Sequence, residues 1–201
     1  MIPRVKACCA IAASLVLGAL VGCADPVREA YVDALGPEDP AVPQSDIHRP
    51  GQPCLLCHGP FGGVEPDMAV AGTIYAYSFD ANDPDAEPIP VEDVIIEISD
   101  SFGNSPPEPP RTNCAGNFYI EKEDWNPSFP LRVAIRYPVP GDPDGARVSM
   151  GTRISRDGSC AGCHTNKPPN QGTPGWVFCT QRSPDAPVFT KPATCTSGDD
   201  D

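Results

Sequence analysis

The stretch LRVAIRY, residues 131–137, decides the fold class. Apolar side chains alternate along it with charged or small ones: Leu131, Val133, Ile135 and Tyr137 lie on one face, and Arg132, Ala134 and Arg136 on the other. A strict period of two residues is typical of a β-strand with one buried face. The stretch therefore predicts a strand that packs one side against a hydrophobic core.

Three segments upstream show the same period. Their apolar positions are Val70, Gly72, Ile74 and Ala76, then Val94, Ile96 and Ile98, then Phe118 and Ile120. Turn-rich sequence separates these segments over residues 80–90 and 101–110. Short strands that each bury one face favour sheets packed face to face. We therefore expect a mainly β fold, an antiparallel β-sandwich.

The flanks of this region are rich in proline. The chain has 27 prolines in 201 residues, and they cluster where apolar periodicity is weak. Residues 23–53 are predicted to form a Pro-rich tether, with one short helical turn around residues 28–35. Residues 183–201, which end in three aspartates, are predicted to form an acidic C-terminal tail.

The N-terminus has the pattern of an export signal. Arg4 and Lys6 precede an apolar run over residues 7–20, which is short for a membrane span. The closing residues LVGC, 20–23, resemble the bacterial lipobox, in which the cysteine is acylated and becomes the mature N-terminus. The resemblance implies a signal peptide over residues 1–22, a lipid anchor on Cys23, and a location in the bacterial cell envelope, at the periplasmic face or the outer membrane and cell surface. An ordinary secretory signal is the alternative.

The charge balance limits the classes of binding partner that the protein can attract electrostatically. The formal net charge is −13, from 27 acidic and 14 basic residues, and removal of the signal would take Arg4 and Lys6 but no acid. This balance argues against nucleic acid and against electrostatic attraction to anionic lipid. The lipid anchor is then what holds the protein to the membrane. We expect redox partner proteins that dock through charge to present a basic surface of their own.

Two copies of one five-residue pattern stand out among the ten cysteines. Residues 54–58 read CLLCH and residues 160–164 read CAGCH, and together they use two of the three histidines in the chain. The pattern C-x-x-C-H is the attachment motif of a c-type haem, in which two thiols add to the vinyl groups of one porphyrin and the histidine ligates the iron. The sequence therefore predicts two covalently bound haem c groups, with the attachment and iron-binding residues Cys54, Cys57, His58, Cys160, Cys163 and His164.

A redox disulfide and a zinc site are the alternatives to haem at these motifs. A redox disulfide of the thioredoxin type needs a helix that opens at the motif, whereas Gly59-Pro60 and residues 165–169 do not continue a helix for long. A Cys2His zinc site would lack an obvious fourth ligand at each motif. Both alternatives are weaker than haem, and both stay open at the level of sequence.

Other residues are candidates for a second protein ligand to each iron, and two further cysteines are candidates for a disulfide. His48 is the one histidine outside the motifs, and Met150 lies ten residues before Cys160, so both are candidate metal ligands. Cys179 and Cys195 lie in one C-terminal stretch, and we predict a disulfide between them. Cys114 is expected to be a turn or core residue.

Three phrases between the motifs resemble a known family. GTIY at 72–75, VIIEI at 94–98 and AGNFYI at 115–120 are similar to the carboxypeptidase regulatory-like repeat, an immunoglobulin-like sandwich that is usually accessory. This resemblance covers residues 69–138, about a third of the chain. It implies a sandwich between a first haem-attachment segment at 54–68 and a second at 139–182. The whole arrangement also resembles exported bacterial c-type cytochromes.

The function expected from these patterns is one-electron transfer by a membrane-anchored di-haem cytochrome c. No nucleophile–base pair or carboxylate pair stands out, so we predict no catalytic residues. One alternative is a haem enzyme of the peroxidase or reductase type with an open axial site. The other is a non-haem cell-surface binding module whose motifs form disulfides or hold a metal ion.

Overall fold

The structure is a computed structural model that describes residues 25–42, 44–77, 87–139, 142–165, 173–180, 187–190 and 195–196. The predicted signal peptide, the lipid site at Cys23 and most of the acidic tail lie outside the described residues. In these ranges, no helix is long and apolar enough to cross a membrane. The chain divides into two compact units, residues 1–36 and 37–201, and each is described by itself.

The first unit contains helix α2 (Pro26–Ala34). Its N-cap is Asp25, whose side chain accepts hydrogen bonds from the backbone N–H groups of Val27 and Arg28. A capping carboxylate followed by proline at the first helical position is a favoured helix start. The helical turn predicted around residues 28–35 is thus part of a nine-residue helix.

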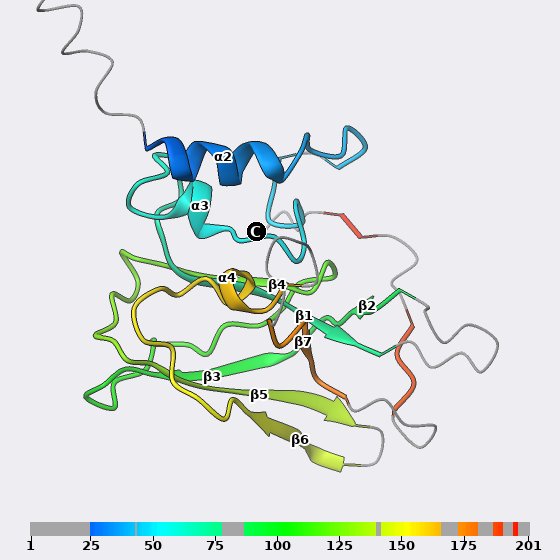
Figure 1. The fold of residues 1–201 in the computed structure, drawn as a ribbon. Helices are drawn as coiled ribbons and strands as arrows, with labels where there is room; N and C mark the ends of the chain where they lie inside the picture. The colour runs from blue at the N-terminus through cyan, green and yellow to red at the C-terminus, as the bar shows by residue number, and fades with distance from the viewer. Residues whose placement is uncertain are drawn as a thin grey trace, which may run out of the picture. The chain divides into compact units, whose positions relative to one another are not determined.

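The second unit contains two β-sheets (Figure 1). The first sheet is built around β1 (Met68–Ala76), with antiparallel neighbours β2 (Ile89–Pro90) and β4 (Asn117–Glu121) and a parallel neighbour β7 (Val177–Phe178). The second sheet is antiparallel in the order β3 (Ile95–Ser99), β5 (Arg132–Val139) and β6 (Asp142–Ser149). The predicted mainly β fold with antiparallel sheets is confirmed.

One hydrophobic core draws on both sheets. Its buried members include Val70, Ile74, Ile96, Ile98, Phe118, Ile120, Leu131 and Ile135. In β3 burial alternates residue by residue, and in β5 Arg132 is exposed while Ala134 and Ile135 are buried. The period of two therefore identified the core-facing positions of these strands, and Ala134 is the exception, because it is buried on the outer face that was expected to meet water.

Strand β1 departs from this pattern because both of its faces are buried. All nine residues are buried, including Ala71, Thr73 and Tyr75 on the face that alternation left outside. Two one-turn helices, α3 (Leu55–His58) and α4 (Cys160–Cys163), both contact β1. The two segments that carry the motifs therefore pack against the same strand.

The sheets also extend beyond the predicted boundary at residue 138. Strand β6 pairs with β5 after it, with Ile135 opposite Val148 and Arg136 opposite Arg147. β6 (DPDGARVS) has mostly polar or small residues and lies at an edge of the sheet, so it shows little of the apolar alternation that marks the buried strands.

The predicted disulfide between Cys179 and Cys195 is wrong. Cys195 pairs with Cys114, at a Cα–Cα distance of 5.4 Å, and Cys179 is a free thiol that is fully buried in the core. Cys114 lies in the turn before β4, as expected, where the N–H of Gly116 donates to the carbonyl of Asn113. The disulfide joins residues 81 positions apart, so proximity in sequence was a poor guide to proximity in space.

Candidate functional site

The first motif forms a single helical turn. The N–H of Cys57 donates to the carbonyl of Cys54 at 3.0 Å, and the N–H of His58 donates to the same carbonyl at 2.9 Å. A helical turn brings side chains three positions apart onto one side, which is the relation of Cys54 to Cys57. A Cβ at Gly59 would lie 2.4 Å from the carbonyl oxygen of Leu55, and one at Gly62 would lie 1.8 Å from that of Cys57. These glycines therefore let the chain fold back tightly over the turn.

The ring of His58 is buried and oriented by the backbone. Its Nδ1 lies 3.2 Å from the carbonyl oxygen of Pro66. Because a carbonyl only accepts, Nδ1 carries the proton and Nε2 keeps its lone pair. A histidine held in this way is in the tautomer that binds a metal through Nε2.

The second motif repeats this arrangement. The N–H of His164 donates to the carbonyl of Cys160 at 2.8 Å, which closes one turn around α4, and Nδ1 of His164 donates to the carbonyl of Gly175 at 2.9 Å. Here too the Nε2 lone pair is left for a metal. The two motif histidines thus share a tautomer although different loops supply the carbonyls.

The second motif is held on β1 by close backbone approaches. The N–H of Ala71 donates to the carbonyl of Gly158 at 3.1 Å. A Cβ at Gly158 would lie 2.0 Å from the carbonyl oxygen of Ala69, and a Cβ at Gly72 would lie 2.9 Å from Sγ of Cys160. Glycine at both positions is therefore what lets α4 approach the strand.

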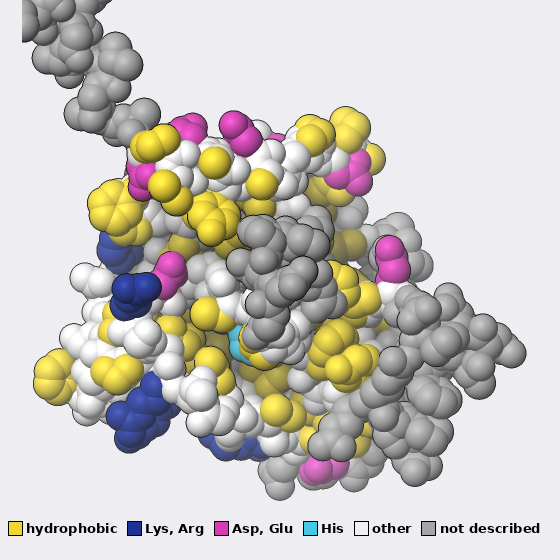
Figure 2. Space-filling model, viewed as in Figure 1, with side chains coloured by type: hydrophobic (Ala, Val, Ile, Leu, Met, Phe, Trp, Pro, Cys, Tyr) yellow, Lys and Arg dark blue, Asp and Glu magenta, His cyan; other side chains and the backbone are white. Residues whose placement is uncertain are grey.

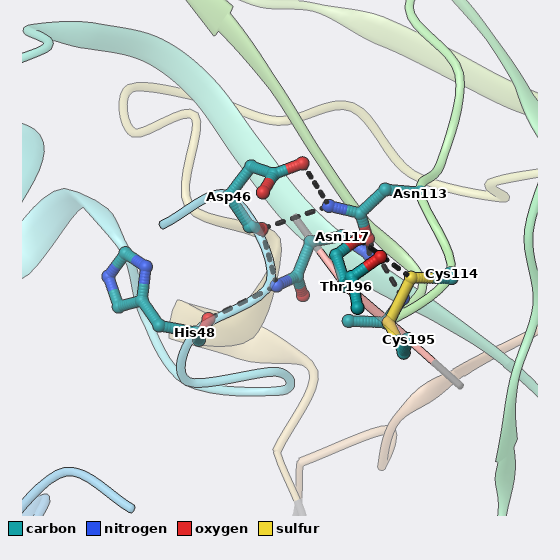
Figure 3. Close-up of a disulfide and its surroundings, with 8 residues drawn as sticks. Asp46, His48, Asn113, Cys114, Asn117, Cys195 and Thr196 are labelled. Atoms are coloured by element: carbon teal, nitrogen blue, oxygen red, sulfur yellow. Dashed lines mark hydrogen bonds between the residues drawn. A yellow bond between two sulfur atoms is a disulfide. The ribbon is translucent and has the colours of Figure 1, made fainter. Parts of the chain in front are cut away.

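The loop that carries His48 is attached to the same sheet by side-chain amides (Figure 3). Nδ2 of the buried Asn117 donates to the carbonyls of Asp46 and His48, each at 3.1 Å, and Nδ2 of Asn113 donates to the carbonyl of Asp46 at 2.9 Å. The hydroxyl of Thr73 on β1 donates to Oδ1 of Asn117 at 2.8 Å. Figure 3 shows the His48 ring on the far side of the loop from these amides.

His48 lies beside the first motif. The ring centres of His48 and His58 are 5.8 Å apart, with the ring planes tilted by 56°. Nδ1 of His48 donates to the carbonyl of Ser45, so its Nε2 also keeps a lone pair. Two imidazole nitrogens that each lie about 2 Å from one metal ion place their ring centres roughly 6 Å apart. The two histidines are therefore spaced like ligands on opposite sides of one ion.

The first thiol of each motif, on Cys54 and on Cys160, is protonated at neutral pH. Burial raises the pKa of Cys54 to about 11. Burial above all, together with the neighbouring Cys54 and Cys163, raises the pKa of Cys160 to about 12. The influence of Cys54 on Cys160 indicates that the first cysteines of the two motifs lie near each other. Thioredoxin-type cysteines have a lowered pKa, so this environment argues against a reactive redox disulfide.

The remaining predicted ligand lies elsewhere. Met150 lines a groove on the β3–β5–β6 sheet, and no residue of either motif is among the residues that line this groove. Within the described part of the chain, no three or more His, Cys, Asp and Glu side chains are grouped to hold a metal ion. A haem requires less of the protein, because its porphyrin supplies four nitrogens to the iron and the chain supplies the axial ligands.

Sequence reasoning missed the residues that orient the histidines. Pro66, Gly175 and Ser45 act through backbone carbonyls, which carry no signal in the side-chain pattern. Thr73 and Asn117 occur within the phrases GTIY and AGNFYI, and the sequence pattern gives them no role of their own. Polar residues at buried strand positions were the one sign that these two have a further role.

Comparison with known proteins assigns the chain to no family. No protein-family model, no curated protein and no solved structure matches this chain.

Proposed function

We propose that the protein is a di-haem c-type cytochrome, held to a membrane by a lipid on Cys23, that transfers single electrons in the bacterial cell envelope. The observation that carries the proposal is the pair His48 and His58, 5.8 Å apart beside the free thiols of Cys54 and Cys57. A covalent haem explains all four side chains at once, because it takes two thiols for attachment and can take two imidazole nitrogens at the iron.

Each haem would be held by residues of one motif. Cys54 and Cys57 would form the thioethers of the first haem, with His58 and His48 as axial ligands. Cys160 and Cys163 would hold the second, with His164 as an axial ligand. Bound haem supplies a one-electron couple between ferric and ferrous iron.

The contribution of the chain is to fix ligands and potential. The carbonyls of Pro66 and Gly175 hold each motif histidine in one tautomer and increase its basicity as a ligand. Asn117 holds the backbone of His48, so this histidine is pre-organised before an iron arrives. Two imidazole ligands give a lower potential than imidazole with thioether. We therefore expect the first site to have the lower potential of the two if Met150 or a weak ligand completes the second.

The two haems would be close neighbours. Gly51, three residues before Cys54, donates its N–H to the hydroxyl of Thr73 at 2.8 Å, and Gly158, two residues before Cys160, accepts from Ala71. The residues just before the two motifs therefore contact positions 73 and 71 of β1, which are two residues apart. Two haems held so near each other would supply a path for electrons between the two irons.

The wider identity is part of the same proposal. Two sheets with a common core are what an immunoglobulin-like sandwich of the carboxypeptidase regulatory-like type would provide. In this role the sandwich is a rigid support that carries two haem segments on one strand. The envelope location and the lipid anchor are inferred from residues 1–23.

One observation favours a second function at the second motif. His48 is the one histidine outside the motifs, and it lies beside His58, so no histidine is left for the iron bound by His164. Met150 remains a candidate from the sequence alone. An open position there would permit binding of a small ligand, as in a peroxidase or reductase.

Intact-mass measurement under denaturing conditions tests the proposal. The protein is produced with and without a haem-attachment system, and the expected result is a chain that gains the mass of two porphyrins only when the system is present. A chain of unmodified mass in both samples would contradict haem binding and would favour the non-haem binding module. Carbon monoxide titration of the reduced protein then separates electron transfer from ligand chemistry at the second iron.

A further inference from the structure

A groove of about 550 Å³ lies on the β3–β5–β6 sheet, whereas the motifs contact β1 in the other sheet. The register of the strands puts Glu97, Ser99, Arg132, Arg147 and Ser149 on the face that points away from the core. Arg153 and the prolines 106 and 109 complete its walls. The groove therefore combines arginine side chains with hydroxyl groups and apolar surface.

The groove is basic although the protein is acidic. Arg132, Arg147 and Arg153 line it, and Glu97 is the one carboxylate among its lining residues. Glu97 is already bound, at 2.6 Å to Arg147 and at 2.9 Å to Arg136. In Figure 2, basic side chains gather at the lower left, over the end of this sheet where β5 begins and β6 ends.

Two of these arginines have no charge partner in the described residues. Arg132 and Arg153 are both exposed, and neither forms an ion pair with a carboxylate of the described ranges. In a chain of net charge −13, with 14 basic residues in all, a cluster of guanidinium groups around one groove concentrates positive potential. The groove is thus suited to an anionic ligand.

The lining favours a carboxylate on a peptide over other anions. A guanidinium group can bind a carboxylate through two parallel hydrogen bonds. In the groove Arg147 already binds the carboxylate of Glu97, through its Nε. The prolines and the Met150 side chain offer apolar surface between the charges. A bare phosphate or a sulfated sugar would leave that surface without a partner, whereas apolar side chains of a peptide would cover it.

We propose that this groove binds an acidic peptide segment of a partner protein, with Arg132 and Arg153 as the principal contacts. The net charge of the chain predicted a basic partner, and the local charge of this face predicts the opposite. The proposal is independent of haem binding, since no residue that lines the groove belongs to either C-x-x-C-H motif. A partner of this kind would be steered to the groove and kept away from the acidic remainder of the surface.

Binding of a short fluorescent peptide rich in Glu and Leu tests the proposal by anisotropy on the full chain. The same peptide with Gln in place of Glu is the control ligand. We expect the acidic peptide to bind with an affinity that falls as salt is added, and Arg132→Gln/Arg153→Gln to weaken it by roughly tenfold or more. The matched control is Arg111→Gln/Arg156→Gln, which removes the same charge from two exposed arginines outside the groove.

Three results would overturn the inference. These are equal weakening by the control pair, equal binding of the Gln peptide, or absence of binding at low salt. Binding of a heparin oligosaccharide or of pyrophosphate that depends on Arg132 and Arg153, without binding of the peptide, would assign the groove to another anion. Arg132→Lys/Arg153→Lys keeps the charge but removes the two-pronged geometry, so we expect intermediate affinity. Circular dichroism and thermal unfolding check that each variant is folded.

Discussion

The two motifs share a five-residue pattern, a one-turn helix and a histidine held through Nδ1, yet their surroundings differ. The first has a second histidine at 5.8 Å, on a loop fixed by Asn113 and Asn117. The second packs closely against β1 at Gly72. The chain has three histidines, and none is left to ligate an iron together with His164. In the proposed cytochrome, the five-residue pattern would therefore determine where each haem is attached. Residues distant in sequence would determine the second ligand of each iron.

Removal of one cysteine pair at a time has the largest expected effect. Cys54→Ala/Cys57→Ala should abolish attachment of the first haem and leave the second, and Cys160→Ala/Cys163→Ala should do the reverse. Intact mass should fall by one porphyrin in each case. Cys179→Ala is the control, because Cys179 is a buried core thiol outside both motifs, and it should keep both haems. Loss of both haems from either pair variant would show that the sites are not separate.

Asn117→Ala should weaken the first site selectively. The change leaves the carbonyl of His48 without its side-chain donor and the carbonyl of Asp46 with Asn113 alone, and we expect a loss of about 1 to 3 kcal/mol in the free energy of unfolding. Urea unfolding measures the loss, and carbon monoxide binding should rise at the first iron. Asn104→Ala is the control, since Asn104 bonds only to the nearby Asp100 through its side chain. If carbon monoxide binding at the first iron does not change in Asn117→Ala, the amide network does not hold His48 in place as a ligand.

Gly72→Ala should disturb the second site instead. The new methyl group would lie 2.9 Å from Sγ and 2.7 Å from Cβ of Cys160, so α4 must move. We expect a loss of about 1 to 3 kcal/mol in the free energy of unfolding and a changed spectrum of the second haem only. Gly151→Ala is the matched control, because nothing lies within 4 Å of a Cβ there. Equal changes at both haems would mean that β1 couples the sites more tightly than the contacts indicate.

The smallest expected effect on stability is that of Glu97→Gln. Glu97 belongs to neither motif, so this variant is a reference in which both haem spectra should stay unchanged. Hydrogen bonds and ion pairs with Arg147 and Arg136 lower the pKa of Glu97 below its usual value. A lowered folded-state pKa gives stability that is present above the unfolded pKa, about 4.3, and is lost as pH falls through the folded pKa. The advantage of the native chain over Glu97→Gln should be about 0.5 kcal/mol near neutral pH and vanish in acid, as measured by urea unfolding across this pH range. A change of either haem spectrum in Glu97→Gln would contradict its independence.

The sequence predicted the strands whose two faces differ. In β3 and β5 one face meets the core and the other meets water, so the period of two residues reports burial directly. β1 joins the core and is also contacted by α3 and α4, so both of its faces are buried. Alternation within a strand carries no information about such cover. β6 was missed because its polar residues lie at an edge of the sheet.

The residues of the candidate site were predictable only where they are close to one another in the sequence. The motif residues follow from their spacing, and His48 was a candidate because it is the one remaining histidine. Its neighbour could not be predicted, since the contact with His58 depends on hydrogen bonds to Asn117, 69 residues later. The disulfide failed for the same reason, because Cys114 and Cys195 meet across 81 positions.

The proposed function depends most on His48 and His58 sharing one iron. The variant Cys160→Ala/Cys163→Ala retains only the first haem, and electron paramagnetic resonance of its oxidised form reports the axial ligands. We predict a low-spin ferric signal of two imidazoles, which His48→Ala converts to a high-spin signal while Met150→Ala leaves it unchanged. A low-spin bis-imidazole signal that persists in His48→Ala would contradict ligation by His48.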